Sequence, residues 1–110
     1  MTSVEALLAR RRKLLARLPA LEETVRASYF VRRRRCGNPR CRCARGAGHR
    51  TAYLAVTLAD GTTEQISLPR ELEGLGRAWV LNYRSFFRTA ERVWAINREL
   101  LRRRRLDPGG

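Results

Sequence analysis

The feature that most constrains the fold of this chain is a short stretch, CGNPRCRCARGAGH, at positions 36–49. It contains all three cysteines and the only histidine of the 110 residues, spaced as C-x4-C-x-C-x5-H. Structural zinc sites take four nitrogen or sulfur ligands in a tetrahedron. The stretch supplies that number, so the sequence predicts one zinc ion per chain, bound by Cys36, Cys41, Cys43 and His49.

Other uses of the cysteines fit the surrounding sequence less well. Three thiols cannot all form disulfides within one chain, and incidental thiols would not be expected to cluster with the only histidine. A catalytic zinc needs an open position and a nearby general base, and a Cys–His nucleophile needs an acid to orient it. No acidic residue occurs from Thr24 to Ala59. We therefore expect a structural metal site and no enzyme activity.

The charge of the chain indicates a polyanionic partner. Lysine and arginine number 24 against 10 acidic residues, a formal net charge of +14, and Lys13 is the only lysine. A GC-rich genome would explain arginine in place of lysine, but not the excess of positive charge. Nine arginines fall in the acid-free segment from Thr24 to Ala59, which favours nucleic acid as the ligand. The predicted phosphate contacts are Arg32, Arg33, Arg34, Arg35, Arg40, Arg42, Arg45 and Arg50.

The hydrophobic pattern predicts an α+β fold in one domain. Strand-like segments at 28–35, 51–58 and 62–68 predict a three-stranded antiparallel meander that carries the zinc loop. Asp60-Gly61 predicts a two-residue turn of the primed type between the last two strands. The predicted parts are an N-terminal helical segment over 1–27, the meander over 28–69, a long C-terminal helix over 70–105 and a flexible tail over 106–110.

Both helical segments carry one apolar stripe, which must be buried. Thr2 and Glu5 have the spacing of a capping box, and Pro19 is expected to kink the first helix or to start a second one. A break near Gly74 and Gly76 is expected in the C-terminal helix, because glycine weakens helices. The stripes are predicted to pair within the chain or across a coiled-coil dimer, through Leu7, Leu14, Leu18 and Leu21 against Trp79, Phe86, Val93 and Leu100.

The pattern CGxPxCxC…G..H, preceded by SYFVRRRR and followed by YLAVTL and a helix with WVLNYRSFFR, resembles a known family. Its members are small, mostly bacterial proteins known only as a domain of unknown function with a zinc-finger-like core. The resemblance covers about residues 28–101. Members often have Gly-Pro after the histidine, where this chain has Arg50-Thr51. The resemblance implies a zinc-binding fold and, through association with mobile elements, DNA as a partner.

Two functions from different classes follow from these features. The first is a zinc-stabilised, non-catalytic protein that binds nucleic acid through its arginines, with DNA favoured over RNA. Tyr29, Phe30 or Tyr53 could add base stacking with a single strand, or pack in the core. The second is a protein-interaction module whose helices bind a partner or form a homodimer, with the arginines as solvated surface. No secretory signal and no 18-residue apolar run is present, so we expect a cytoplasmic protein without a membrane partner, nucleoid-associated if it binds DNA.

Overall fold

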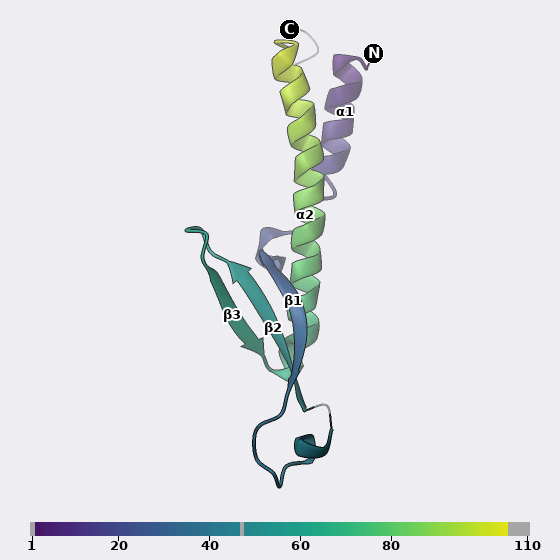
Figure 1. Cartoon of the computed structure of the whole chain (residues 1–110). Coiled ribbons are helices and arrows are strands. Elements are labelled where there is room, and N and C mark those ends of the chain that lie inside the picture. Colours follow the sequence, from purple (N-terminus) through teal and green to yellow (C-terminus); the bar gives the residue numbers. More distant parts are fainter. Residues whose placement is uncertain (1, 47, 106–110) are drawn as a thin grey trace. The chain divides into compact units, whose positions relative to one another are not determined.

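The computed structural model describes residues 2–46 and 48–105, and it has the predicted α+β fold. An N-terminal helix is followed by a three-stranded antiparallel sheet and a long C-terminal helix (Figure 1). In chain order the elements are α1 (Val4–Leu15), η1 (Leu21–Glu23), β1 (Ala27–Arg34), η2 (Arg42–Arg45), β2 (His49–Thr57), β3 (Thr63–Leu68) and α2 (Arg70–Arg102).

The chain divides into two compact units. We call residues 1–23 with 82–110 the helical unit and residues 24–81 the sheet unit. The first part of α2 belongs to the sheet unit and the remainder to the helical unit. The prediction of one domain stays a prediction, and the tail predicted over 106–110 lies outside the described residues. Within those residues, no helix combines the length and apolar character needed to cross a membrane.

Helix α1 is shorter than the sequence predicts. Its N-cap is Ser3, whose side chain accepts a hydrogen bond from the Ala6 amide at 3.1 Å, in place of the predicted cap at Thr2. The helix ends at Leu15. Pro19 lacks an amide hydrogen and disfavours helical geometry in the residue before it, so the helix cannot continue through this point. Only a short 3₁₀ turn, η1, follows the proline.

The core of the helical unit lies between α1 and the C-terminal part of α2. The predicted pairing of Leu7 and Leu14 with Val93 and Leu100 is confirmed, since all four are buried in one cluster. Val4 and Ile96 complete this cluster. Of the other predicted partners, Leu18 and Leu21 follow the end of α1 and Trp79 belongs to the sheet unit. Phe86 is partly buried and does not belong to this cluster.

Arg11 interrupts the apolar stripe of α1 and forms a hydrogen bond with α2. Arg11 Nη1 donates a hydrogen bond to Asn97 Oδ1 of α2 at 2.7 Å. This contact allows a charged side chain to lie within an otherwise apolar stripe, because the guanidinium keeps a hydrogen-bond acceptor there.

The core of the sheet unit lies on one face of the sheet. The strand order is β1-β2-β3, and Ala27 and Leu54 are buried with Val80 of α2. Contrary to the expected break, α2 is continuous through its glycines. At Gly76 a Cβ atom would lie 2.7 Å from Leu68 Cδ1, so glycine at this position leaves room for the Leu68 side chain.

The connection between β2 and β3 is not the predicted two-residue turn. Leu58 N donates to Thr62 O at 2.8 Å and Gly61 N donates to Leu58 O at 3.0 Å, which encloses a three-residue loop. Gly61 has a φ of +89°, whereas Asp60 keeps a negative φ, and a type I′ turn needs positive φ at both central residues. The Asp60 carboxylate instead accepts a hydrogen bond from Thr62 N at 2.9 Å.

Two adjacent leucines test the core of the helical unit. Leu100 is 0% exposed and Leu101 is 66% exposed. Leu100→Ala is expected to lower the free energy of unfolding by about 2–5 kcal/mol, because it leaves a cavity in the core. Leu101→Ala is expected to change it by less than about 0.5 kcal/mol. Urea denaturation of both variants measures the difference, and equal effects would contradict the placement of this core.

Candidate metal centre

The loop between β1 and β2 carries the candidate site. The strands pair antiparallel up to Arg34 opposite His49, and the loop extends beyond this last pair (Figure 1). Within the loop, Asn38 accepts two hydrogen bonds from backbone amides that follow it. Its side-chain oxygen accepts from Arg40 N and its backbone oxygen accepts from Cys41 N, each at 3.0 Å. The 3₁₀ helix η2 then follows and places Cys43.

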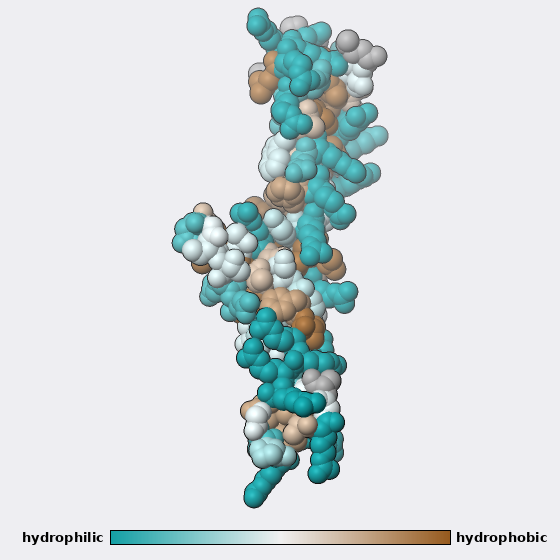
Figure 2. Space-filling model, viewed as in Figure 1, coloured by the Kyte–Doolittle hydropathy of each residue, from teal (hydrophilic) through white to brown (hydrophobic). Residues whose placement is uncertain are grey.

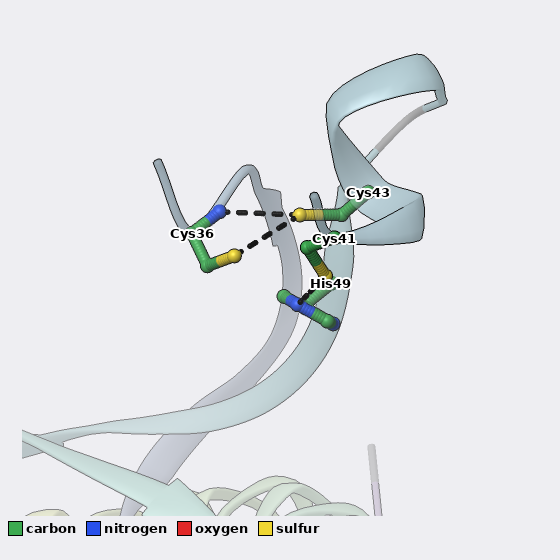
Figure 3. Close-up of side chains that lie close together, drawn as sticks. All are labelled: Cys36, Cys41, Cys43 and His49. Carbon is green, nitrogen blue, oxygen red and sulfur yellow. Dashed lines mark hydrogen bonds between the residues drawn. The ribbon is translucent and has the colours of Figure 1, made fainter. Parts of the chain in front are cut away.

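The ligand atoms of Cys36, Cys41, Cys43 and His49 all lie within 4.8 Å of one another. Figure 3 shows the four side chains converging from different parts of the loop and from the start of β2. Cys41 Sγ lies 3.3 Å from His49 Nε2, and Cys43 Sγ lies 3.4 Å from Cys36 Sγ. A tetrahedral zinc with Zn–S bonds of about 2.3 Å would separate two sulfurs by about 3.8 Å. The cluster therefore has the size of a zinc site.

The four candidate ligands differ in their exposure. Cys43 is buried, with 7% of its surface exposed, and Cys41 is partly buried. Cys36 and His49 are exposed. The Cys36 amide donates to Cys43 Sγ at 3.3 Å, a contact of the kind that stabilises a metal-bound thiolate. One side of the cluster is thus packed against the loop, and the other side faces solvent.

Local contacts shift the pKa values of Cys36 and Cys43 in opposite directions. A backbone hydrogen bond from Asn38, followed by contacts with Cys43, His49 and Cys41, lowers the pKa of Cys36 to about 6. At Cys43, the hydrogen bond from the Cys36 backbone lowers the pKa, but burial and the neighbouring thiols outweigh it and raise the pKa overall. At neutral pH the metal-free cluster therefore already holds a thiolate at Cys36, the form of cysteine that binds metals.

Gly48 allows the loop to close. Its φ is +94°, and a Cβ at this position would lie 2.6 Å from the Arg34 carbonyl carbon and 2.8 Å from the Arg35 amide nitrogen. Only glycine permits this backbone approach, since these neighbours are themselves backbone atoms. The contact lies immediately before His49, so it sets the position of the histidine relative to the end of β1.

The predicted arginines of the strands lie on both faces of the sheet. Side chains alternate along a strand, so Arg32 and Arg34 share one face while Arg33 lies on the other. Arg33 is directly opposite Arg50 in the register. Arg50 is not free for phosphate, since its Nη1 atom lies 2.8 Å from Glu73 Oε2 of α2. The sequence offered no signal for this ion pair, because Glu73 lies far along the chain on a helix.

The predicted arginines of the loop lie close to the cysteine cluster. Arg35 Nε donates to the Gly46 carbonyl at 3.1 Å, which fixes one guanidinium across the loop. Arg40, Arg42 and Arg45 are exposed. In Figure 2, hydrophilic side chains gather over the end of the β1–β2 hairpin and its loop. Six of the eight predicted arginines are therefore on the loop or on the sheet face that includes Arg34.

A family model described as a domain of unknown function, DUF6788, matches residues 4–77. The chain belongs to this family. The match begins in α1 and ends in the first part of α2, so it includes the whole sheet and all four candidate ligands. It starts earlier and ends earlier than the resemblance over about 28–101 suggests. No curated protein and no solved structure matches the chain.

Two glycines of the loop provide a matched test of the closure. Gly48→Ala is expected to lower the free energy of unfolding by about 1–3 kcal/mol, because it forces a strained φ and a backbone clash. Gly46→Ala is expected to have little effect, since φ there is −139° and a Cβ would meet nothing within 4 Å. Thermal denaturation at a fixed zinc concentration compares the two. A Gly48 variant as stable as the parent would show that the loop closes differently.

Proposed function

We propose that the chain binds one zinc ion through Cys36, Cys41, Cys43 and His49, and that the ion holds an arginine-bearing loop that binds nucleic acid. The protein has no catalytic activity of its own in this proposal. The observation that carries it is the convergence of the four ligand atoms within 4.8 Å in a loop that is rich in arginine.

The chemistry of the donors favours zinc. Three thiolates and one imidazole form a soft donor set, and this set suits a tetrahedral structural zinc. With all four positions supplied by the protein, no position is left for a water or a substrate, which supports a structural role. The bound ion would leave the site with one net negative charge, and this charge is set among basic side chains such as Arg40 and Arg42.

Metal content tests the first half of the proposal. Purified protein is expected to contain one zinc per chain, and Cys41→Ser is expected to lose zinc on dialysis against a chelator. Ala44→Ser is the control, because it adds a hydroxyl to the same loop without changing a ligand. Elemental analysis measures the zinc content of the parent and of both variants, and thiol titration measures their free cysteines. Clearly substoichiometric zinc, with all three thiols titratable in the native protein, would rule out the site.

The arrangement of the arginines supports the second half of the proposal. Guanidinium groups make paired hydrogen bonds with phosphate oxygens. A loop fixed by a metal orders its arginines before binding, which reduces the entropy lost on association. The available residues are Arg32, Arg34, Arg35, Arg40, Arg42 and Arg45. DNA is the favoured ligand, and the mobile-element association that the sequence resemblance implies remains part of this proposal.

Salt dependence tests nucleic-acid binding. About six phosphate contacts predict a slope of log K against log salt of about −5 on duplex DNA. Removing four arginines from the loop and sheet is expected to reduce this slope to about −2. The control variant loses the same charge from exposed positions elsewhere. The test variant carries Arg32→Ala, Arg34→Ala, Arg40→Ala and Arg42→Ala; the control carries Arg12→Ala, Arg77→Ala, Arg84→Ala and Arg88→Ala.

Equal losses in the two variants would mean that net charge alone attracts the nucleic acid. No binding by the parent at low salt would contradict the proposal and favour the second candidate function, a protein-interaction module. That candidate has support in the helical unit, where a groove of about 570 Å³ lies between α1 and α2. Leu7, Leu14 and Ile96 form part of its lining, together with basic side chains such as Arg10 and Arg92. Such a groove suits an amphipathic helix with acidic flanks.

A further inference from the structure

The face of the sheet turned away from Val80 carries an aromatic pair. In the β1–β2 register Phe30 lies directly opposite Tyr53. Their ring centroids are 5.3 Å apart with an interplanar angle of 15°, so the rings stack. Both side chains are only partly buried. Tyr29, the neighbouring aromatic residue, packs in the core on the opposite face.

Positive charge adjoins these rings. The Arg32 guanidinium carbon lies 5.5 Å from the centroid of Phe30 and 5.7 Å from that of Tyr53, within the range of cation–π contacts. Arg34 follows on the same face, next to the candidate metal loop. The rings and the arginines thus form one continuous surface, which we call the aromatic face.

The aromatic face carries no acidic side chain among the described strand residues. The single acid of the three strands, Glu64, is paired with Val56, and Val56 packs against the core on the opposite face. Hydroxyl and amide side chains fill the remaining positions, apart from Ala55 and His49. These polar side chains are Ser28, Thr51, Thr57, Thr63, Gln65 and Ser67. The surface therefore combines aromatic area, positive charge and neutral hydrogen-bonding groups.

We propose that the aromatic face of the sheet, centred on Phe30 and Tyr53, binds the unpaired bases of a single-stranded polynucleotide. This inference rests on the proposed nucleic-acid function and names its ligand class. Unpaired bases stack on exposed aromatic side chains, as they do on other antiparallel sheets that bind RNA, whereas a duplex keeps its base faces hidden. Arg32 and Arg34 supply charge for the phosphates beside the stacked bases.

Charge complementarity selects this ligand over an apolar protein surface. Arg32 and Arg34 lie on the aromatic face, and four further arginines lie in the adjoining loop, at positions 35, 40, 42 and 45. A polyanion neutralises this charge, and its bases provide flat apolar surfaces for the rings. Both DNA and RNA offer this chemistry.

The test compares the binding of intact and abasic single strands of equal length, in DNA and in RNA. Fluorescence anisotropy across a salt series measures the affinities. The abasic strand keeps its phosphates and lacks bases. The parent is expected to bind the intact strand at least about tenfold more tightly. The variant with Phe30→Leu and Tyr53→Leu is expected to lose this preference and to keep its salt slope, since no phosphate contact is removed.

The control variant carries Tyr83→Leu and Phe87→Leu. It removes a contacting aromatic pair of the same composition from the helical unit, and it is expected to bind like the parent. Equal binding of intact and abasic strands by the parent would overturn the aromatic face as a stacking site, while salt-dependent binding would still support the arginine contacts. That comparison needs no substitution, so misfolding of a variant cannot obscure it. Absence of binding to every strand at low salt would overturn both proposals.

Discussion

The antiparallel pairing of β1 with β2 is the constraint on which the rest of the sheet unit depends. Its last pair, Arg34 with His49, fixes where the loop leaves one strand and enters the next. The close approach of Gly48 to the Arg34 and Arg35 backbone then closes the loop tightly. Cys36 and His49 are brought together by this closure, although many residues separate them along the chain. The candidate metal centre is therefore a consequence of strand register.

The sheet unit has little apolar core to hold this pairing. Among its described residues, the buried cluster consists of Ala27, Leu54 and Val80, and the hydrophobic side chains packed against this cluster are only partly buried: Val25, Tyr29, Val56 and Leu68. Arg33 directly opposite Arg50 adds repulsion between like charges, which the ion pair of Arg50 with Glu73 offsets. In small domains the free energy of metal binding is also free energy of folding. A zinc ion in the β1–β2 loop would thus stabilise a part of the unit that lies beyond this buried cluster and is rich in positive charge.

The element types, the grouping of the four candidate ligands and the apolar stripes of the helices could be predicted from the sequence, because each depends on local spacing. Alternation along the segment TAYLAVTL is enough to place Leu54 and Tyr53 on opposite faces, which is where the structure has them. The helical segment predicted over 1–27 is too long because the apolar stripe continues past Leu15. The helix ends there because Pro19 cannot donate a backbone hydrogen bond. The same alternation along a strand divides Arg32 to Arg34 between the two faces of the sheet. Residue spacing does not show which face of the sheet α2 covers, or that Arg50 forms an ion pair with Glu73. Both depend on tertiary packing.

The proposed metal centre requires one zinc ion bound by three cysteines and the histidine of the β1–β2 hairpin. X-ray absorption spectroscopy at the zinc edge of the intact protein tests it most directly, because it reports the identity and distance of the ligands. We expect three sulfur ligands at about 2.3 Å and one nitrogen ligand at about 2.0–2.1 Å. A first shell made only of oxygen and nitrogen, or one with fewer than three sulfurs, would contradict it.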